Sequence, residues 1–238
     1  LRERDFAVDL MMLDKANGAR SEAALVFSMC QGRAALENLA QWEREGVRIM
    51  NSPQAALNTH RDRLPALMIE AKLPFPQTNL MATDAEADLH DLDLAEGIWL
   101  KRGDVHASVT ADVQWVDSAE RLAASLAEFA RRGIQLAALQ AHRAGDEIKF
   151  YGVAGGAFFH WFYSGTARKY PFDSSRLQKL GNDAATAAGL DIFGGDVIVS
   201  PEGELTLIDL NDWPSFAPCR ERASYAIADY ISKRVHAR

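Results

Sequence analysis

The spacing of hydrophobic residues divides the first third of the chain into short alternating elements. Two apolar runs, at 24–29 and 47–50, flank the stretch 33–45, in which apolar residues recur at helical intervals. This pattern predicts a strand, a helix and a second strand, with Gly46 ending the helix. Helical spacing returns at 62–72, and the two prolines of the LPFPQT segment that follows predict an extended exit.

The rest of the chain combines longer helices with strands. The GIWLK segment at 97–101 predicts a strand, and the stretch 148–163 alternates around Gly155-Gly156, a pair that supplies the positive φ of a tight β-hairpin turn. A second hairpin is predicted at 194–212. Amphipathic stretches predict helices at 118–132, with Ser118 as N-cap, at 174–188 and at 221–233. Helices mixed with largely antiparallel strands predict an α+β fold, preceded by a small parallel unit.

Composition and charge exclude several classes of protein. The chain is 48% hydrophobic and 25% charged, with a net charge of -7 spread over interspersed acidic and basic residues, so we expect a globular protein without a nucleic-acid partner. The two cysteines, Cys30 and Cys219, are too far apart in sequence to suggest a disulfide framework or a thiolate zinc site. The sequence contains no apolar run of about 18 residues and does not begin like a signal peptide. We therefore expect a cytoplasmic protein without a membrane partner.

The second hairpin carries the most informative candidate chemistry. If Glu202-Gly203 forms a two-residue turn, counting outward along both strands places Asp196 opposite Asp209. Because side chains alternate along a strand, Asn211 then lies on the same face as Asp209. Opposed carboxylates repel unless a cation or proton lies between them, and oxygen ligands suit Mg²⁺. Alternatively, Asp209 and Asn211 only cap the strand end, although the place of Asp196 inside an apolar strand favours the metal.

At these residues the sequence resembles the ATP-grasp superfamily, whose members end their nucleotide domain with an acidic residue in one strand and an acidic-x-Asn pair in the next. The resemblance implies that Asp196, Asp209 and Asn211 hold the magnesium ions that bridge the phosphates of ATP. Arg61 takes the place of the basic residue before the helix that leads to LPFPQT. The IWLK segment is similar to the family's lysine-ending strand, which makes Lys101 the expected phosphate-binding lysine. Both residues could also be solvated surface charges.

The segment 137–156 is similar to the linker strand of the family and the glycine-ending segment after it. The resemblance implies that the adenine hinge is formed by Gln140, Ala141 and His142, that Glu147 lies near the ribose, and that Lys149 points at the phosphates. Two simpler explanations stay open. Glu147 and Lys149 could form only a cross-strand pair, and His142 could be a packed or solvent-exposed histidine.

The sequence departs from the family pattern in two places. Family members carry a glycine-rich loop after the strand lysine, whereas RGDVHASVTADVQWV contains only Gly103. We therefore expect the phosphates to be covered by other groups, for which Arg102, His106 and Ser108 are the candidates. The part of the chain that precedes the nucleotide domain is also short.

The resemblance implies an ATP-grasp fold of two α+β subdomains that clamp ATP, after a short α/β unit. We expect the α/β unit at 1–56, the clamping subdomain at 57–138 and the metal-binding subdomain at 139–238. The implied activity is an ATP- and magnesium-dependent ligase that activates a carboxylate as an acyl phosphate for attack by an amine, with Lys101, Lys149 and Arg61 assisting phosphoryl transfer.

Two other activities remain alternatives to the ligase. One is a small-molecule kinase, because the inositol trisphosphate kinases share this fold, and the other is an ATP-binding module without turnover. For the ligase we expect a small-molecule or peptide carboxylate substrate. Its anionic group could be held by any of four polar or basic residues, Arg168, Arg176, Ser215 and Arg220. We also expect Asp209→Ala to abolish turnover yet leave the fold intact, because it removes one of two repelling carboxylates.

Overall fold

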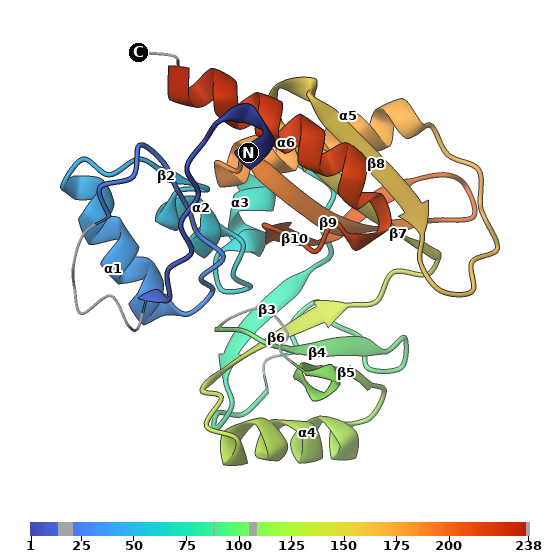
Figure 1. Ribbon diagram of the computed structural model, residues 1–238. Coiled ribbons are helices and arrows are strands. Elements are labelled where there is room, and N and C mark those ends of the chain that lie inside the picture. The colour runs from blue at the N-terminus through green and yellow to red at the C-terminus, as the bar shows by residue number, and fades with distance from the viewer. Residues whose placement is uncertain (14–20, 88, 105–108, 237–238) are drawn as a thin grey trace.

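The computed structural model describes residues 1–13, 21–87, 89–104 and 109–236. Figure 1 shows three parts: a small unit that holds the N-terminal elements, a large sheet between helices, and a smaller sheet that lies below it. Among the described residues, short 3-10 helices are formed by Arg2–Arg4, Thr110–Asp112, Ala154–Gly156 and Ala217–Cys219.

The N-terminal unit has the predicted order of strand, helix and strand. Strands β1 (Val26–Phe27) and β2 (Ile49–Met50) pair in parallel, and α1 (Arg33–Arg44) connects them. Buried Leu36 and Trp42 of α1 pack with the residues around β2. Apolar residues on one face of α1 thus provide the core of this unit.

The smaller sheet consists of four antiparallel strands in the order β3-β6-β4-β5. Its strands are β3 (Thr78–Ala82), β4 (Ile98–Arg102), β5 (Val113–Val116) and β6 (Leu136–Ala141). Helix α4 (Ala119–Arg131) covers one face, and Ser118 caps it as predicted by accepting a hydrogen bond from the backbone N–H of Arg121 at 3.3 Å. Phe129 of α4 and Leu100 of β4 are fully buried in this core, so the side chain of Lys101 lies on the opposite face of the sheet.

The large sheet is also antiparallel, in the order β10-β9-β7-β8. Its strands are β7 (Asp146–Val153), β8 (Phe158–Tyr163), β9 (Ile192–Val199) and β10 (Leu205–Asp212). One face packs against α2 (Pro53–Asn58), α3 (Leu64–Glu70) and α5 (Ser174–Ala188), and the other against α6 (Arg220–His236). Two antiparallel sheets with helices on their faces confirm the predicted α+β class (Figure 1).

The pairing of Asp196 with Asp209 is confirmed, but the turn that precedes it differs from the predicted one. Leu205 pairs with Val199, one residue away from the predicted register, so the loop is longer than the two residues Glu202-Gly203. A bulge between Leu207 and Asp209 then shifts the register back. The two differences cancel at Asp209, which is why the predicted pair forms.

The predicted division at residues 56 and 138 stays a prediction. By sheet membership β6, which ends at Ala141, belongs to the smaller sheet, while α2 and α3 pack on the large one. Within the described ranges, no helix is long and apolar enough to cross a membrane.

Candidate nucleotide and metal site

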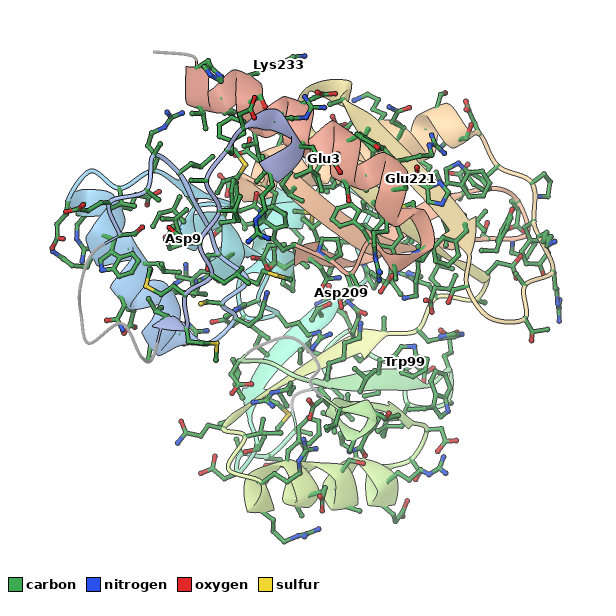
Figure 2. All side chains as sticks on the ribbon, in the orientation of Figure 1. Glu3, Asp9, Trp99, Asp209, Glu221 and Lys233 are labelled. Carbon is green, nitrogen blue, oxygen red and sulfur yellow. The ribbon has the colours of Figure 1, made fainter. Side chains whose placement is uncertain are left out.

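Several of the residues predicted from the sequence meet where the two sheets face each other. Figure 2 shows Asp209 at the edge of the large sheet nearest the smaller sheet, which carries Trp99. A narrow cleft here is lined by Arg61, Lys101, Gln140 and Asp209. A larger cavity of about 390 Å³ lies beside it and is lined in part by Lys149, Asp196, Asn211 and Ser215.

Lys101 reaches from the smaller sheet to the large one. Its side chain is buried, and Nζ donates to Gln140 Oε1 at 2.7 Å and lies 3.5 Å from the carbonyl oxygen of Ile208. Ile208 is the bulge residue of β10, so its carbonyl is left outside the regular strand pairing. Burial lowers the pKa of Lys101 to about 8, although the nearby Asp209 carboxylate opposes this change.

Arg61 also joins the two sheets. Its Nη2 donates to Asp209 Oδ2 at 2.9 Å, and its Nη1 donates to the carbonyl oxygen of Arg102 at 3.3 Å. The side chains of Arg61 and Asp209 are only 7% and 13% exposed. The expectation that Asp209→Ala leaves the fold intact stays a prediction, but this ion pair argues against it, because the substitution would leave a buried guanidinium without its carboxylate.

Lys149 contacts Asp196, the second carboxylate of the Asp196–Asp209 pair. Its Nζ lies 2.9 Å from Asp196 Oδ1 and 3.0 Å from Glu147 Oε1. The Glu147–Lys149 pair considered from the sequence therefore forms, but within β7, and the cross-strand partner of Lys149 is Asp196. Burial by itself lowers the pKa of Lys149, but the two carboxylates outweigh burial and raise it. Burial also raises the pKa of Asp196, to about 6, with Lys149 opposing and Asp209 adding to the rise.

The donor set fits a magnesium ion that is shared with phosphate. Asp196 and Asp209 are directly paired across β9 and β10, and Asn211 lines the cavity that contains Asp196. In the described part of the chain, no group of three or more His, Cys, Asp or Glu side chains is arranged around a common point. Two carboxylates and one amide oxygen are too few for Mg²⁺ alone, which would take further oxygens from phosphate and water.

The other two residues expected at the adenine hinge lie at the end of β6, with Ala141 as its last residue and His142 directly after it. Ala141 donates its backbone N–H to the carbonyl oxygen of Gln77 at 2.9 Å. His142 packs edge-on against Trp115 at 4.9 Å between ring centroids, and its Nδ1 accepts from Trp99 Nε1 at 3.3 Å. This agrees with the alternative of a packed histidine, and burial lowers the pKa of His142.

The candidate substrate residues are scattered. Ser215 lines the larger cavity, whereas Arg176 pairs with Glu204 on the surface and Arg168 donates to the hydroxyl of Tyr170 at 2.9 Å. Arg220 is the exposed first residue of α6.

Two of the three candidates for covering the phosphates, His106 and Ser108, lie outside the described residues. The third, Arg102, is held by Asp104 and lies 3.7 Å from Asp112.

Several residues that line the larger cavity were not singled out from the sequence. Among them are Gln31, Tyr151, Asp212 and Trp213. Asp212 directly follows the acidic-x-Asn pair, so an extra carboxylate at the end of a strand was the available signal. Gln31 lies 181 residues away from its partner Asp212, and no local pattern connects the two.

Comparison with solved structures identifies the fold. The RimK domain ATP-grasp protein from Sphaerobacter thermophilus DSM 20745 matches with a TM-score of 0.68 and 18% identity over 88% of this chain and 82% of that protein. The D-alanine-D-alanine ligase from Coxiella burnetii matches with a TM-score of 0.64 and 14% identity over 84% of this chain. The ATP-grasp ligase PsnB, in complex with a minimal precursor, matches with a TM-score of 0.55 and 19% identity over 82% of this chain and 69% of PsnB.

The match spans 62% of the length of the Coxiella ligase. No protein-family model matches the sequence, and no curated protein matches it. The likeness therefore concerns the arrangement of elements, at identities of 14% to 19% in these three structures. The two facing antiparallel sheets and these structural matches together show that the chain has the ATP-grasp fold.

Proposed function

We propose that the chain binds ATP with magnesium between its two sheets and activates a carboxylate as an acyl phosphate for attack by an amine. The observation that carries this proposal is the convergence of two lysines with a pair of opposed carboxylates. Lys101 enters from the smaller sheet, and Lys149, Asp196 and Asp209 from the large one. Cations beside oxygen ligands of magnesium suit a triphosphate, whose transfer needs positioning and charge neutralisation.

The proposed roles follow from the position of each side chain. Lys101 and Lys149 offset the charge of the phosphates, and Arg61 binds a phosphate oxygen after it releases Asp209. Asp196, Asp209 and Asn211 would hold magnesium, which supplies charge neutralisation at the phosphate oxygens when it is bound. Gln140, Ala141, His142 and Glu147 remain the proposed contacts of the adenosine, although the packing of His142 against Trp115 favours a structural part for its ring.

The structural neighbours support a ligase rather than another class of ATP-binding protein. Several are D-alanine-D-alanine ligases, and PsnB was solved with a precursor peptide and AMPPNP. For this chain we propose a small-molecule or peptide carboxylate as the second substrate, with Ser215 as the candidate contact inside the cavity.

A product analysis tests the proposal. The protein is incubated with ATP and magnesium against panels of carboxylates and amines, and ADP, AMP and phosphate are all quantified. We expect ADP and phosphate in equal amounts only when carboxylate and amine are both present, because the amine displaces phosphate from the acyl phosphate. A phosphorylated hydroxyl compound without free phosphate, or AMP as product, would contradict the ligase.

Two variants link turnover to the site. Asp196→Asn should lose turnover because it removes one of the opposed carboxylates. Asp183→Asn is the matched control, since Asp183 is a surface carboxylate of α5 that pairs with Lys179.

A further inference from the structure

The larger cavity has a second polar end, formed by Gln31 and Asp212. Gln31 lies in the loop before α1 and Asp212 is the last residue of β10, so this end lies between the N-terminal unit and the large sheet. Lys149 and Asp196 line the same cavity. A volume of about 390 Å³ is within the range of small-molecule sites.

Asp212 is a buried carboxylate without a cation. It is 3% exposed, and its Oδ1 accepts from Gln31 Nε2 at 2.7 Å, but no Lys, Arg or His among the described residues pairs with it. The other buried carboxylates are compensated: Asp112 pairs with Arg132, and Asp146 accepts from two backbone N–H groups. A buried carboxylate is stabilised by a cation partner, so a cation at this position would stabilise the protein.

Gln31 adds an acceptor to the same end. Its amide nitrogen is used by Asp212, and its Oε1 is buried without a hydrogen-bond partner in the described structure. Turning the amide over would bring Oε1 against the carboxylate, so the present orientation is the favourable one. A carboxylate and an amide oxygen together suit a ligand with a positive charge and several N–H donors, which describes a primary ammonium group.

The walls of the cavity suit the same kind of ligand. Tyr151 and Trp213 both line it, and Trp213 is fixed by a hydrogen bond from Nε1 to the carbonyl oxygen of Met50 at 3.1 Å. Aromatic rings attract ammonium cations that lie within about 6 Å of the ring centre.

We propose that this end of the cavity binds the primary ammonium group of a small organic ligand, between the Asp212 carboxylate and Gln31 Oε1. The inference rests on the proposed function only where it takes this ligand to be the second substrate, with the rest of the molecule extending toward Lys149 and Asp196. From the sequence we expected a substrate anion to be held by arginines. At this end of the cavity the charged protein group is a carboxylate, Asp212, so the ligand group expected here is a cation.

Pairs of nearly isosteric ligands test the inference. Alanine is compared with isobutyrate, β-alanine with butyrate, and 4-aminobutyrate with pentanoate, by calorimetric titration of the full chain with and without magnesium and ATP. In each pair only the ammonium group is exchanged for methyl. We expect at least one amine to bind at least tenfold more tightly than its partner. Equal binding within all three pairs would overturn the inference.

Two variants separate ligand binding from a structural role. Asp212→Asn keeps the shape and removes the charge, so we expect at least a tenfold loss of amine affinity together with an unchanged or higher melting temperature. Gln31→Leu removes the second acceptor, the amide oxygen Oε1, and should also weaken binding of the amine. Unchanged amine affinity in Asp212→Asn, or a melting temperature lowered by many degrees, would overturn the proposed site.

Titration of magnesium and ATP in parallel distinguishes the two proposals. If ATP does not bind while the amine pairs still differ, the proposed function fails and the ammonium site stands. If ATP binds and the amine pairs do not differ, only the ammonium site fails.

Discussion

Lys101 should make the stability of the protein depend on pH in a defined window. Its pKa in the folded protein is about 8, whereas its ordinary value is 10.5. Between these two pH values the unfolded state binds more protons than the folded state, so the free energy of unfolding rises with pH. Below pH 8 the lysine is protonated in both states, and the full cost of burying its charge is present.

The size of the effect follows from the two pKa values. A difference of one pKa unit corresponds to about 1.4 kcal/mol, so the gap between 8 and 10.5 corresponds to about 3 kcal/mol. Lys101→Met has no titrating group at this position. Replacing the lysine also deprives Gln140 of its partner, at a cost of about 1 to 3 kcal/mol, but that cost does not change with pH.

Urea unfolding of the wild type and Lys101→Met at pH 7, 8, 9 and 10 measures the effect. The free energy of unfolding of the wild type, relative to the variant, should increase by about 2 to 3 kcal/mol from pH 7 to pH 10. Lys179→Met is the control, because Lys179 is 76% exposed, and its difference from the wild type should stay flat. A flat difference for Lys101→Met would refute the reasoning, since it would mean that the ammonium group is not desolvated in the folded protein.

Three further substitutions test other parts of the structure by denaturant unfolding. Asp209→Ala should destabilise the protein by about 3 kcal/mol because Arg61 stays buried without its carboxylate, and adding Arg61→Leu should recover part of the loss; additive effects would contradict a coupled pair. Gly152→Ala should lower the free energy of unfolding by about 3 kcal/mol, since its Cβ would lie 2.3 Å from the ring of Phe193. A variant as stable as the wild type would contradict this close packing. Asn51→Ala should cost about 2 to 4 kcal/mol through its three hydrogen bonds at the start of β9, and a loss under 1 kcal/mol would contradict them.

The sequence predicted well those elements whose ends are marked by residues within the element itself or directly beside it. Helix α5 has the predicted bounds, 174–188, because both of its ends are marked: Asp173 accepts from the backbone N–H of Ser175, and Gly189 takes the left-handed conformation with φ 79°. Strands β3 and β5 were not predicted. They are five and four residues long and are stabilised mainly by neighbours from other parts of the chain.

The candidate site was predictable as a set of residues but not as a set of contacts. Asp196 and Asp209 lie on adjacent strands of one hairpin, and counting residues paired them only because the longer turn and the bulge at Ile208, neither of which was foreseen, cancel at Asp209. The partner of Asp209 is Arg61, 148 residues away in sequence. No local pattern identifies such a partner, because only the packing of α3 and the two sheets brings it close.

Binding of ATP with and without magnesium tests the central claim most directly. Calorimetric titration of the wild type, Asp196→Asn and the control Asp183→Asn should show that magnesium strengthens ATP binding at least tenfold in the wild type and the control. Asp196→Asn should lose most of that gain, because magnesium then has one carboxylate fewer to join to the phosphates. ATP binding that does not depend on magnesium, or that Asp196→Asn leaves unchanged, would contradict a magnesium and ATP site between the two sheets.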